Sequence, residues 1–148
     1  MAASDSPGLR IARIAPADLG AYKTLRDEAL RLHPDAFDAD IESEQARPPE
    51  SFIGRLGLGE PLGGSFLLGA WADGHMVGMI GLERQSMQKL RHSAELNSMM
   101  VRPSHTARGV GRLLMDACIA EARKAIKGKR FFHVPVTDSN QSVLQFID

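Results

Sequence analysis

The sequence predicts one mixed α/β domain in which a mostly antiparallel sheet is flanked by helices. Several runs alternate apolar and polar residues as half-buried strands do, and others space their apolar residues as amphipathic helices do. Asp73-Gly74 separates two strand-like runs and is the strongest hairpin signal in the chain. The length of 148 residues suits a single domain with one sizeable core.

The first part of the chain predicts a strand followed by two helices. Residues 9–15 alternate as a strand does, and Pro16 ends the run. An amphipathic helix is expected in the stretch from Pro16 to Pro34, where the last proline disfavours its continuation. A shorter helix is expected over residues 49–56, which begin with the proline that suits a first helical position.

The rest of the chain predicts four strands and two further helices. A helix is expected to begin near Gly109, and Asp138 or Ser139 is expected to cap a second one close to the last residue. The four strands are expected over residues 65–72, 75–85, 92–101 and 130–136.

Composition narrows the classes of partner. The 18 Lys and Arg residues balance the 18 Asp and Glu residues, so no net basic field attracts nucleic acid or an anionic membrane. Cys118 is the only cysteine and is interpreted as buried packing, and the histidines show no ligand spacing, so no metal site is expected. The sequence shows no secretion signal and no apolar run near the roughly 20 residues of a membrane span, which predicts a cytoplasmic protein.

Gly109 and Gly111 stand where a predicted strand has turned into a predicted helix. The first N–H groups of a helix lack internal acceptors and the helix dipole is positive there, so this end binds anions. Glycines let a ligand approach the backbone, and Arg108 and Arg112 can neutralise phosphate charge. A dinucleotide fingerprint would need glycine at Leu114, and a P-loop would need lysine at Arg112, so neither motif fits.

Val101-Arg102-Pro103 and the turn from Thr106 to Gly111 resemble motif A of the GNAT N-acetyltransferase superfamily. In that family a strand ending in Val-x-Pro runs into a Gln/Arg-x-x-Gly-x-Gly/Ala turn and a helix that hold the pyrophosphate of acetyl-CoA. Here Thr106 replaces the usual Gln or Arg, and Ala107 replaces a frequent glycine. The order of helices and strands extends the resemblance over nearly the whole chain, which implies a GNAT-like fold.

The resemblance implies that two strands splay apart at the cofactor site and that the pantetheine arm bonds the exposed main chain there. Pro135 favours this splay because proline cannot donate to a ladder, although an edge position explains it equally well. The two methionines of the set are at least as well explained as core filling, and its asparagine as a helix cap. The implied cofactor-binding residues are Met99, Met100, Val101, Thr106, Ala107, Arg108, Gly109, Val110, Gly111, Arg112 and Asn140.

The resemblance further implies direct acetyl transfer to a primary amine of a small molecule or a protein. An amine is mostly protonated at pH 7, so a base is needed, and Glu95 stands where histone-type relatives carry a glutamate. Strand alternation predicts that Glu95 shares a face with Met99 and Val101, opposite Leu96 and Met100. A solvent-facing charge is the alternative for Glu95, and His92 is the reserve base.

Two departures from the family pattern favour an alternative function without efficient catalysis. Ile147 stands where many relatives have a tyrosine that protonates the leaving thiolate, and the sequence stops before the last two strands the family shows. The expected sheet then exposes an edge, which favours a homodimer formed through it. The alternative function is a catalytically weak or inactive CoA-binding module, or an accessory subunit of the same fold. An acidic run is interpreted as a solvated loop, or as a segment that attracts a cationic amine. Its members are Asp35, Asp38, Asp40, Glu42 and Glu44.

Overall fold

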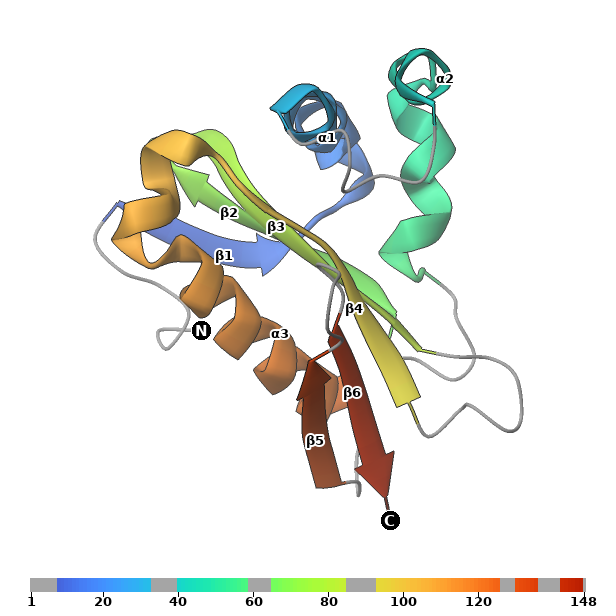
Figure 1. Ribbon diagram of the computed structural model, residues 1–148, viewed down its shortest axis with the longest axis vertical. Helices are drawn as coiled ribbons and strands as arrows, with labels where there is room; N and C mark the ends of the chain where they lie inside the picture. The colour runs from blue at the N-terminus through green and yellow to red at the C-terminus, as the bar shows by residue number, and fades with distance from the viewer. Residues whose placement is uncertain are drawn as a thin grey trace.

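The computed structural model describes residues 8–32, 40–58, 65–84, 93–125, 130–135 and 142–147. These residues form three layers, with α1, α2 and η4 on one face of a sheet and α3 on the other (Figure 1). The strands are β1 (Leu9–Arg13), β2 (Phe66–Ala72), β3 (His75–Arg84), β4 (Ser93–Val101), β5 (Arg130–Pro135) and β6 (Ser142–Ile147). The helices are α1 (Leu19–Leu32), α2 (Ile41–Gln45) and α3 (Val110–Ala125), with 3₁₀ turns η2 (Pro16–Asp18), η4 (Pro49–Leu56) and η5 (Pro103–Arg108).

The sheet has the strand order β1-β2-β3-β4-β6-β5, and every pair of neighbours is antiparallel. Since β6 is antiparallel to both β4 and β5, β5 runs parallel to β4 but does not pair with it. The expected mixed α/β fold with helices on both faces is confirmed. The Asp73-Gly74 hairpin is confirmed too, because φ is 51° at Asp73 and 80° at Gly74, as a type I′ turn requires.

The core has two parts, one on each face of the sheet. Alternation along β2 sends Phe66 and Leu68 to the α3 side and Leu67 to the α1 side. The α3 side also buries Val110, Leu114 and Cys118 of the helix itself, whereas α1 packs through Tyr22 and Leu25. The apolar spacing that predicted the two longer helices therefore corresponds to these two buried stripes.

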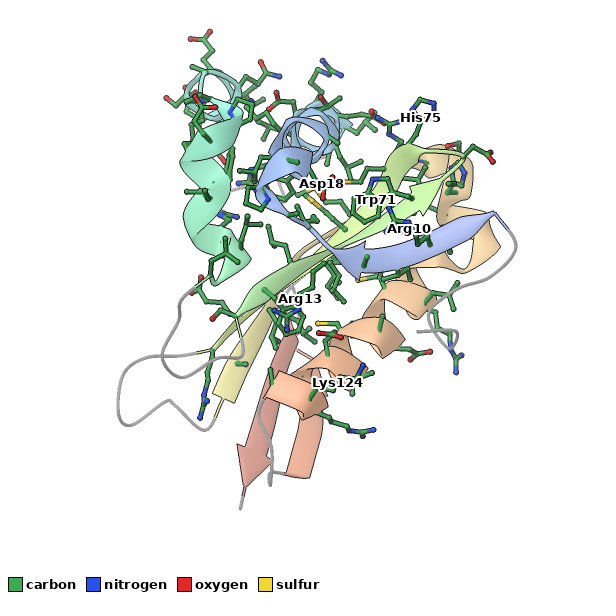
Figure 2. The ribbon with its side chains drawn as sticks, turned by 180° about the vertical axis from the view of Figure 1, so that it is seen from behind. Arg10, Arg13, Asp18, Trp71, His75 and Lys124 are labelled. Atoms are coloured by element: carbon green, nitrogen blue, oxygen red, sulfur yellow. The ribbon has the colours of Figure 1, made fainter. Side chains whose placement is uncertain are left out.

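Two arginines protect the outer strand of the sheet (Figure 2). The guanidinium of Arg10 lies 4.7 Å from the ring centroid of Trp71, and that of Arg13 lies 4.8 Å from the ring of Phe66. Arg13 also donates to Glu121 of α3 at 3.0 Å. Positive charges along β1 disfavour pairing of this edge with another chain.

An ionic network joins the three helical segments that cover the α1 face. Glu44 of α2 is buried, and its carboxylate accepts from Arg26 of α1 at 2.5 Å and from Arg47 at 3.4 Å. Both guanidiniums also lie over the ring of Phe52 in η4, at 5.1 and 4.0 Å. Burial alone raises the pKa of Glu44, but the hydrogen bonds and charges of the two arginines outweigh it and hold that pKa below its ordinary value.

One predicted element is wrong. The last residues were expected to begin a helix, whereas Ser142–Ile147 forms β6 and pairs with β4 on one side and β5 on the other. The segment is rich in Val, Phe and Ile, which favour strands, and two neighbouring strands satisfy its backbone. The proposed caps Asp138 and Ser139 lie outside the described residues.

Replacing the buried carboxylate tests the ionic network. We expect Glu44→Gln to lower the free energy of unfolding at pH 7 by about 3 kcal/mol, because it removes the buried negative charge that both guanidiniums contact. The folded-state pKa lies below the ordinary 4.5, so the stabilisation is fully present above about pH 4.5 and is lost as pH falls through the lowered pKa.

Urea unfolding of both proteins from pH 7 to pH 3 measures this difference. The matched control is Glu42→Gln, an exposed position on the same short helix, which is expected to change stability only slightly. Equal stability of the Glu44→Gln variant and the wild type at pH 7 would contradict the assigned role.

Candidate functional site

The first turn of α3 lies directly after the end of β4. The ladder continues one residue beyond β4, because the Arg102 N–H donates to the Val77 carbonyl at 2.8 Å. The chain then turns through η5 and Gly109 into α3, whose first internal hydrogen bond joins the Leu113 N–H to the Gly109 carbonyl at 3.1 Å. The amides of Val110, Gly111 and Arg112 precede that bond, so they have no acceptor within the helix.

Gly109 makes the turn possible and leaves space beside it. Its φ of 76° lies in the left-handed region, where glycine is not strained. A Cβ built on Gly109 would have no neighbour within 4 Å among the described residues, and Gly109 is exposed. Backbone conformation is therefore the reason for glycine here, and the open space agrees with the predicted approach of an anion.

Gly111 has a different environment from the predicted one. A Cβ at this position would lie 2.9 Å from Cε of Met99 and 3.8 Å from a methyl group of Val101. The space of the missing side chain is thus filled by β4, whereas the sequence predicted that it admits a ligand. Glycine at this position serves the contact between α3 and β4.

Two polar side chains of the turn differ in whether they bond the protein itself or remain at the surface. The Thr106 hydroxyl donates to the Pro103 carbonyl at 3.1 Å, so it stabilises η5. Arg112 is 88% exposed, and its Nε lies 3.9 Å from the carboxylate of Asp116, which leaves its charge at the surface beside the free amides. The side chains of Ala107 and Arg108 lie outside the described part of the structure.

Part of β4 has an unpaired edge next to this turn. β4 pairs with β6 only over Ser93–Leu96, whereas Asn97, Met100 and Val101 pair with β3 alone among the described residues. A parting of strands beside β4 was predicted, and it begins after Leu96, although the strand that parts there is β6 and not β5. Pro135 ends the outermost strand and pairs with Ser142, so its edge position is sufficient to explain it.

A β-bulge in β4 reverses the predicted facing of its residues. Met79 pairs with Met100, and Gly81 pairs with Asn97. Between these two pairs β3 advances by two residues and β4 by three, so β4 carries one extra residue. Leu96 consequently lies in the α3-side core, whereas Met100 packs against the α1-side core. The expectation that these two residues share a face is wrong, because an inserted residue interrupts the alternation.

The bulge also bears on Glu95. Glu95 was predicted to share a face with Met99 and Val101. That prediction counted alternation without interruption, whereas the bulge lies between Glu95 and both of these residues. The backbone of Glu95 pairs with Glu83 of β3 and Val143 of β6. Its side chain lies outside the described part of the structure, as do His92 and Asn140, so their roles stay predictions.

Sequence reasoning missed a contact between the two sides of the site. Arg102 NH2 lies 3.3 Å from Glu28 Oε2, which joins the end of β4 to α1. The Nε atom of Arg102 is buried without a hydrogen-bond partner in the described part of the chain. No sequence pattern links positions 28 and 102, because their proximity depends on how α1 lies on the sheet.

The acidic run has structural roles at the positions that are described. Asp40 accepts from the backbone of Ser43 at 3.2 Å as the N-cap of α2, and Glu44 belongs to the ionic network. Asp35 and Asp38 lie outside the described residues. Across the described part of the chain, no cluster of metal-ligating residues is found, and no described helix is long and apolar enough to cross a membrane.

Cys118 lies in the α3-side core and is completely buried. Burial raises the pKa of its thiol to about 12, with a smaller contribution from the charge of Glu121. A thiol in this state is a poor nucleophile. The expectation that Cys118 packs the core is confirmed.

The sequence model of the acetyltransferase (GNAT) family matches residues 22–147. Among curated proteins, no relative matches the chain. Two solved structures with a similar fold contain a CoA molecule. A putative acetyltransferase from Salmonella typhimurium with acetyl-CoA has a TM-score of 0.60 and 22% identity, over 94% of this chain and 91% of that chain. An N-acetyltransferase from Thermoplasma acidophilum with coenzyme A has a TM-score of 0.64 and 18% identity, over 92% and 96%.

A third similar structure is a ribosomal-protein-alanine N-acetyltransferase from Brucella melitensis. Its TM-score is 0.59 at 20% identity, over 93% of this chain and 96% of that chain. At these identities the three structures show a shared fold.

The conformation of Gly109 predicts a ranking of substitutions. Because φ is positive and no steric obstacle exists, we expect Gly109→Asn to be tolerated better than Gly109→Ala, which costs about 1 kcal/mol of stability, and Gly109→Val to be the worst. Thermal or urea unfolding measures the order. A variant series with equal stabilities would show that the left-handed conformation is not required.

Burial of Cys118 predicts an unreactive thiol. With a pKa of about 12 and no exposed surface, the thiol should not react with a chromogenic disulfide reagent at pH 8 in the folded protein. In urea above the unfolding transition, one equivalent should react at once. Rapid labelling without denaturant would contradict the buried position.

Proposed function

Because this chain belongs to the GNAT family of acetyltransferases, we propose that it moves an acetyl group from acetyl-CoA to a primary amine by direct transfer. The fold agrees with that of acetyltransferases solved with acetyl-CoA or coenzyme A, which supports the choice of donor. The acceptor is proposed to be a small-molecule or protein amine in the cytoplasm.

The observation that carries the proposal is the meeting of two sets of free backbone groups. No described strand pairs with the outer edge of Asn97–Val101, and the amides of Val110, Gly111 and Arg112 lack acceptors within α3. An edge binds the amides of an extended ligand as an added strand would, and a helix N-terminus binds phosphate. A pantetheine arm that ends in a diphosphate needs both, in this order.

The residues proposed to hold the donor follow from this geometry. The main chain of Met99, Met100 and Val101 would bond the pantetheine amides. The diphosphate would lie against the turn from Thr106 to Gly111, with the exposed charge of Arg112 beside it. Asn140 is proposed to bond the arm as well. Bound here, acetyl-CoA would supply an activated thioester.

Glu95 is proposed as the general base. It accepts the proton of the ammonium group, directly or through water, and leaves a neutral amine. The amine nitrogen then bonds to the acetyl carbon, the carbon–sulfur bond breaks with its electron pair on sulfur, and the nitrogen loses its second proton to the departing thiolate or to water. The thiol that forms has a pKa of about 8.5, so the thiolate leaves with little help from an acid. Backbone N–H groups of β4 are proposed to stabilise the oxyanion, a contribution of roughly 3 kcal/mol per donor.

Two further parts of the proposal concern the assembly and the chemistry at the site. Transfer is proposed to need no metal, nucleic acid or membrane. A homodimer formed through an exposed sheet edge is proposed as the assembly. Gel filtration combined with light scattering measures the mass directly.

Donor binding and turnover are tested separately. Acetyl-CoA at about 100 times its Kd should stabilise the folded protein by about 2.7 kcal/mol, which raises the melting temperature. An unchanged melting temperature at saturating acetyl-CoA would contradict the proposal. Release of free CoA thiol is then followed with a panel of amines, which includes a polyamine, an amino acid, an aminoglycoside and a peptide N-terminus. Binding without thiol release would favour the alternative, a CoA-binding module.

The base assignment makes a specific prediction. Glu95→Gln should lower kcat at pH 7 by about 100-fold or more, with little change in the affinity for acetyl-CoA, because only proton removal is lost. Glu83→Gln is the matched control, since Glu83 is exposed and pairs with Glu95 across β3 and β4. Undiminished turnover in Glu95→Gln would remove Glu95 from the mechanism and direct the same test to His92.

A further inference from the structure

The side chain of Met99 occupies the space in front of Gly111. The terminal methyl of Met99 lies 2.9 Å from where a Cβ of residue 111 would stand, closer than carbon atoms normally approach. We propose that Met99 and Gly111 form a matched pair that keeps the strand edge of Asn97–Val101 open for the donor arm, so that Met99 is a positioning residue. This inference rests on the proposed function.

The helix cannot make room for a larger residue at position 111. A Cβ on Gly78 of β3 would lie 3.0 Å from Leu114, 3.1 Å from the Met100 carbonyl and 3.3 Å from Val110. Val110 and Leu114 are 2% and 0% exposed, so the first turns of α3 are held against the sheet on this side. Shifting or rotating α3 would break buried contacts that are already close-packed.

Met99 is the partner that can move. Its side chain is 37% exposed, and the atom next to Gly111 is the end of an unbranched chain with three rotatable bonds. The Val101 methyl at 3.8 Å and the buried α3 residues close the inner side. A displaced Met99 side chain therefore turns outward, toward the edge of Asn97–Val101 that no described strand pairs with, which is where the arm is proposed to lie.

Affinity for the donor thus depends on a side chain and not only on backbone groups. With glycine at position 111, the Met99 methyl stays against α3 and the edge is open. With alanine at position 111, the methyl moves over the edge and competes with the pantetheine arm. Removing the Met99 side chain in the same protein removes the competitor.

The test is a double-mutant cycle with Gly111→Ala, Met99→Ala and the double variant. Calorimetry uses acetyl-CoA and adenosine 3′,5′-bisphosphate, which lacks the pantetheine arm. We expect Gly111→Ala to weaken acetyl-CoA binding about tenfold, the effect of roughly 1.4 kcal/mol, and to leave bisphosphate binding unchanged. The double variant should recover to within about twofold of Met99→Ala.

Melting temperatures separate this effect from damage to the fold. Gly111→Ala should not lower the melting temperature, because alanine favours a helix more than glycine does. Gly20→Ala is the matched control, since Gly20 lies in α1 with nothing within 4 Å of its absent Cβ, and donor binding should not change.

Three results would overturn the inference while the wild type still binds acetyl-CoA. These are unchanged affinity in Gly111→Ala, an equal loss of affinity for the bisphosphate, and no recovery in the double variant. A wild type that does not bind acetyl-CoA would instead contradict the proposed function itself.

Discussion

The close packing of α3 against the sheet at Gly78 determines where the candidate site lies. Val110 and Leu114 come so near to β3 that a single Cβ on Gly78 would press on both. This contact places the first turn of α3 beside the end of β4, so that amides without an acceptor in α3 lie next to a strand edge that no described strand pairs with. Without it, the helix terminus and the strand edge would lie apart.

The bulge in β4 is the second constraint, because it changes which residues meet α3. An extra residue between Asn97 and Met100 lets Leu96 and Val101 both face α3, while Met100 faces α1. The same irregularity coincides with the parting of β4 from β6 after Leu96. A bulge bends a strand and disturbs its ladder locally, so the exposed main chain and the altered facing have one cause.

The opposite face of the sheet is stabilised by different means. There α1 is accompanied by two short segments, α2 and η4, and a buried carboxylate with two arginines over an aromatic ring joins the three. Glu28 and Arg102 extend this linkage to the end of β4. The acidic run could have attracted a cationic substrate, but two of its members stabilise helices. Asp40 caps α2, and Glu44 joins α2 to α1. The sequence pattern around Glu44 is the same in either role, because Arg26, which joins this carboxylate to α1, is distant in the chain.

Residue types and their spacing were sufficient for the local elements. Alternation predicted β1, strand-like runs predicted β2 to β5, helical spacing predicted α1 and α3, and Asp73-Gly74 predicted the hairpin, because each depends on neighbours a few residues apart. The short helix α2 was not predicted. The turn at Gly109 was likewise predictable, since only its own backbone angle requires glycine. Tertiary structure decided the rest. The strand at Ser142–Ile147 forms because two strands lie beside it, and the space at Gly111 is filled because β4 delivers Met99 there. Contacts between residues far apart in the chain have no signature in the spacing of either segment, so only the folded arrangement determines them.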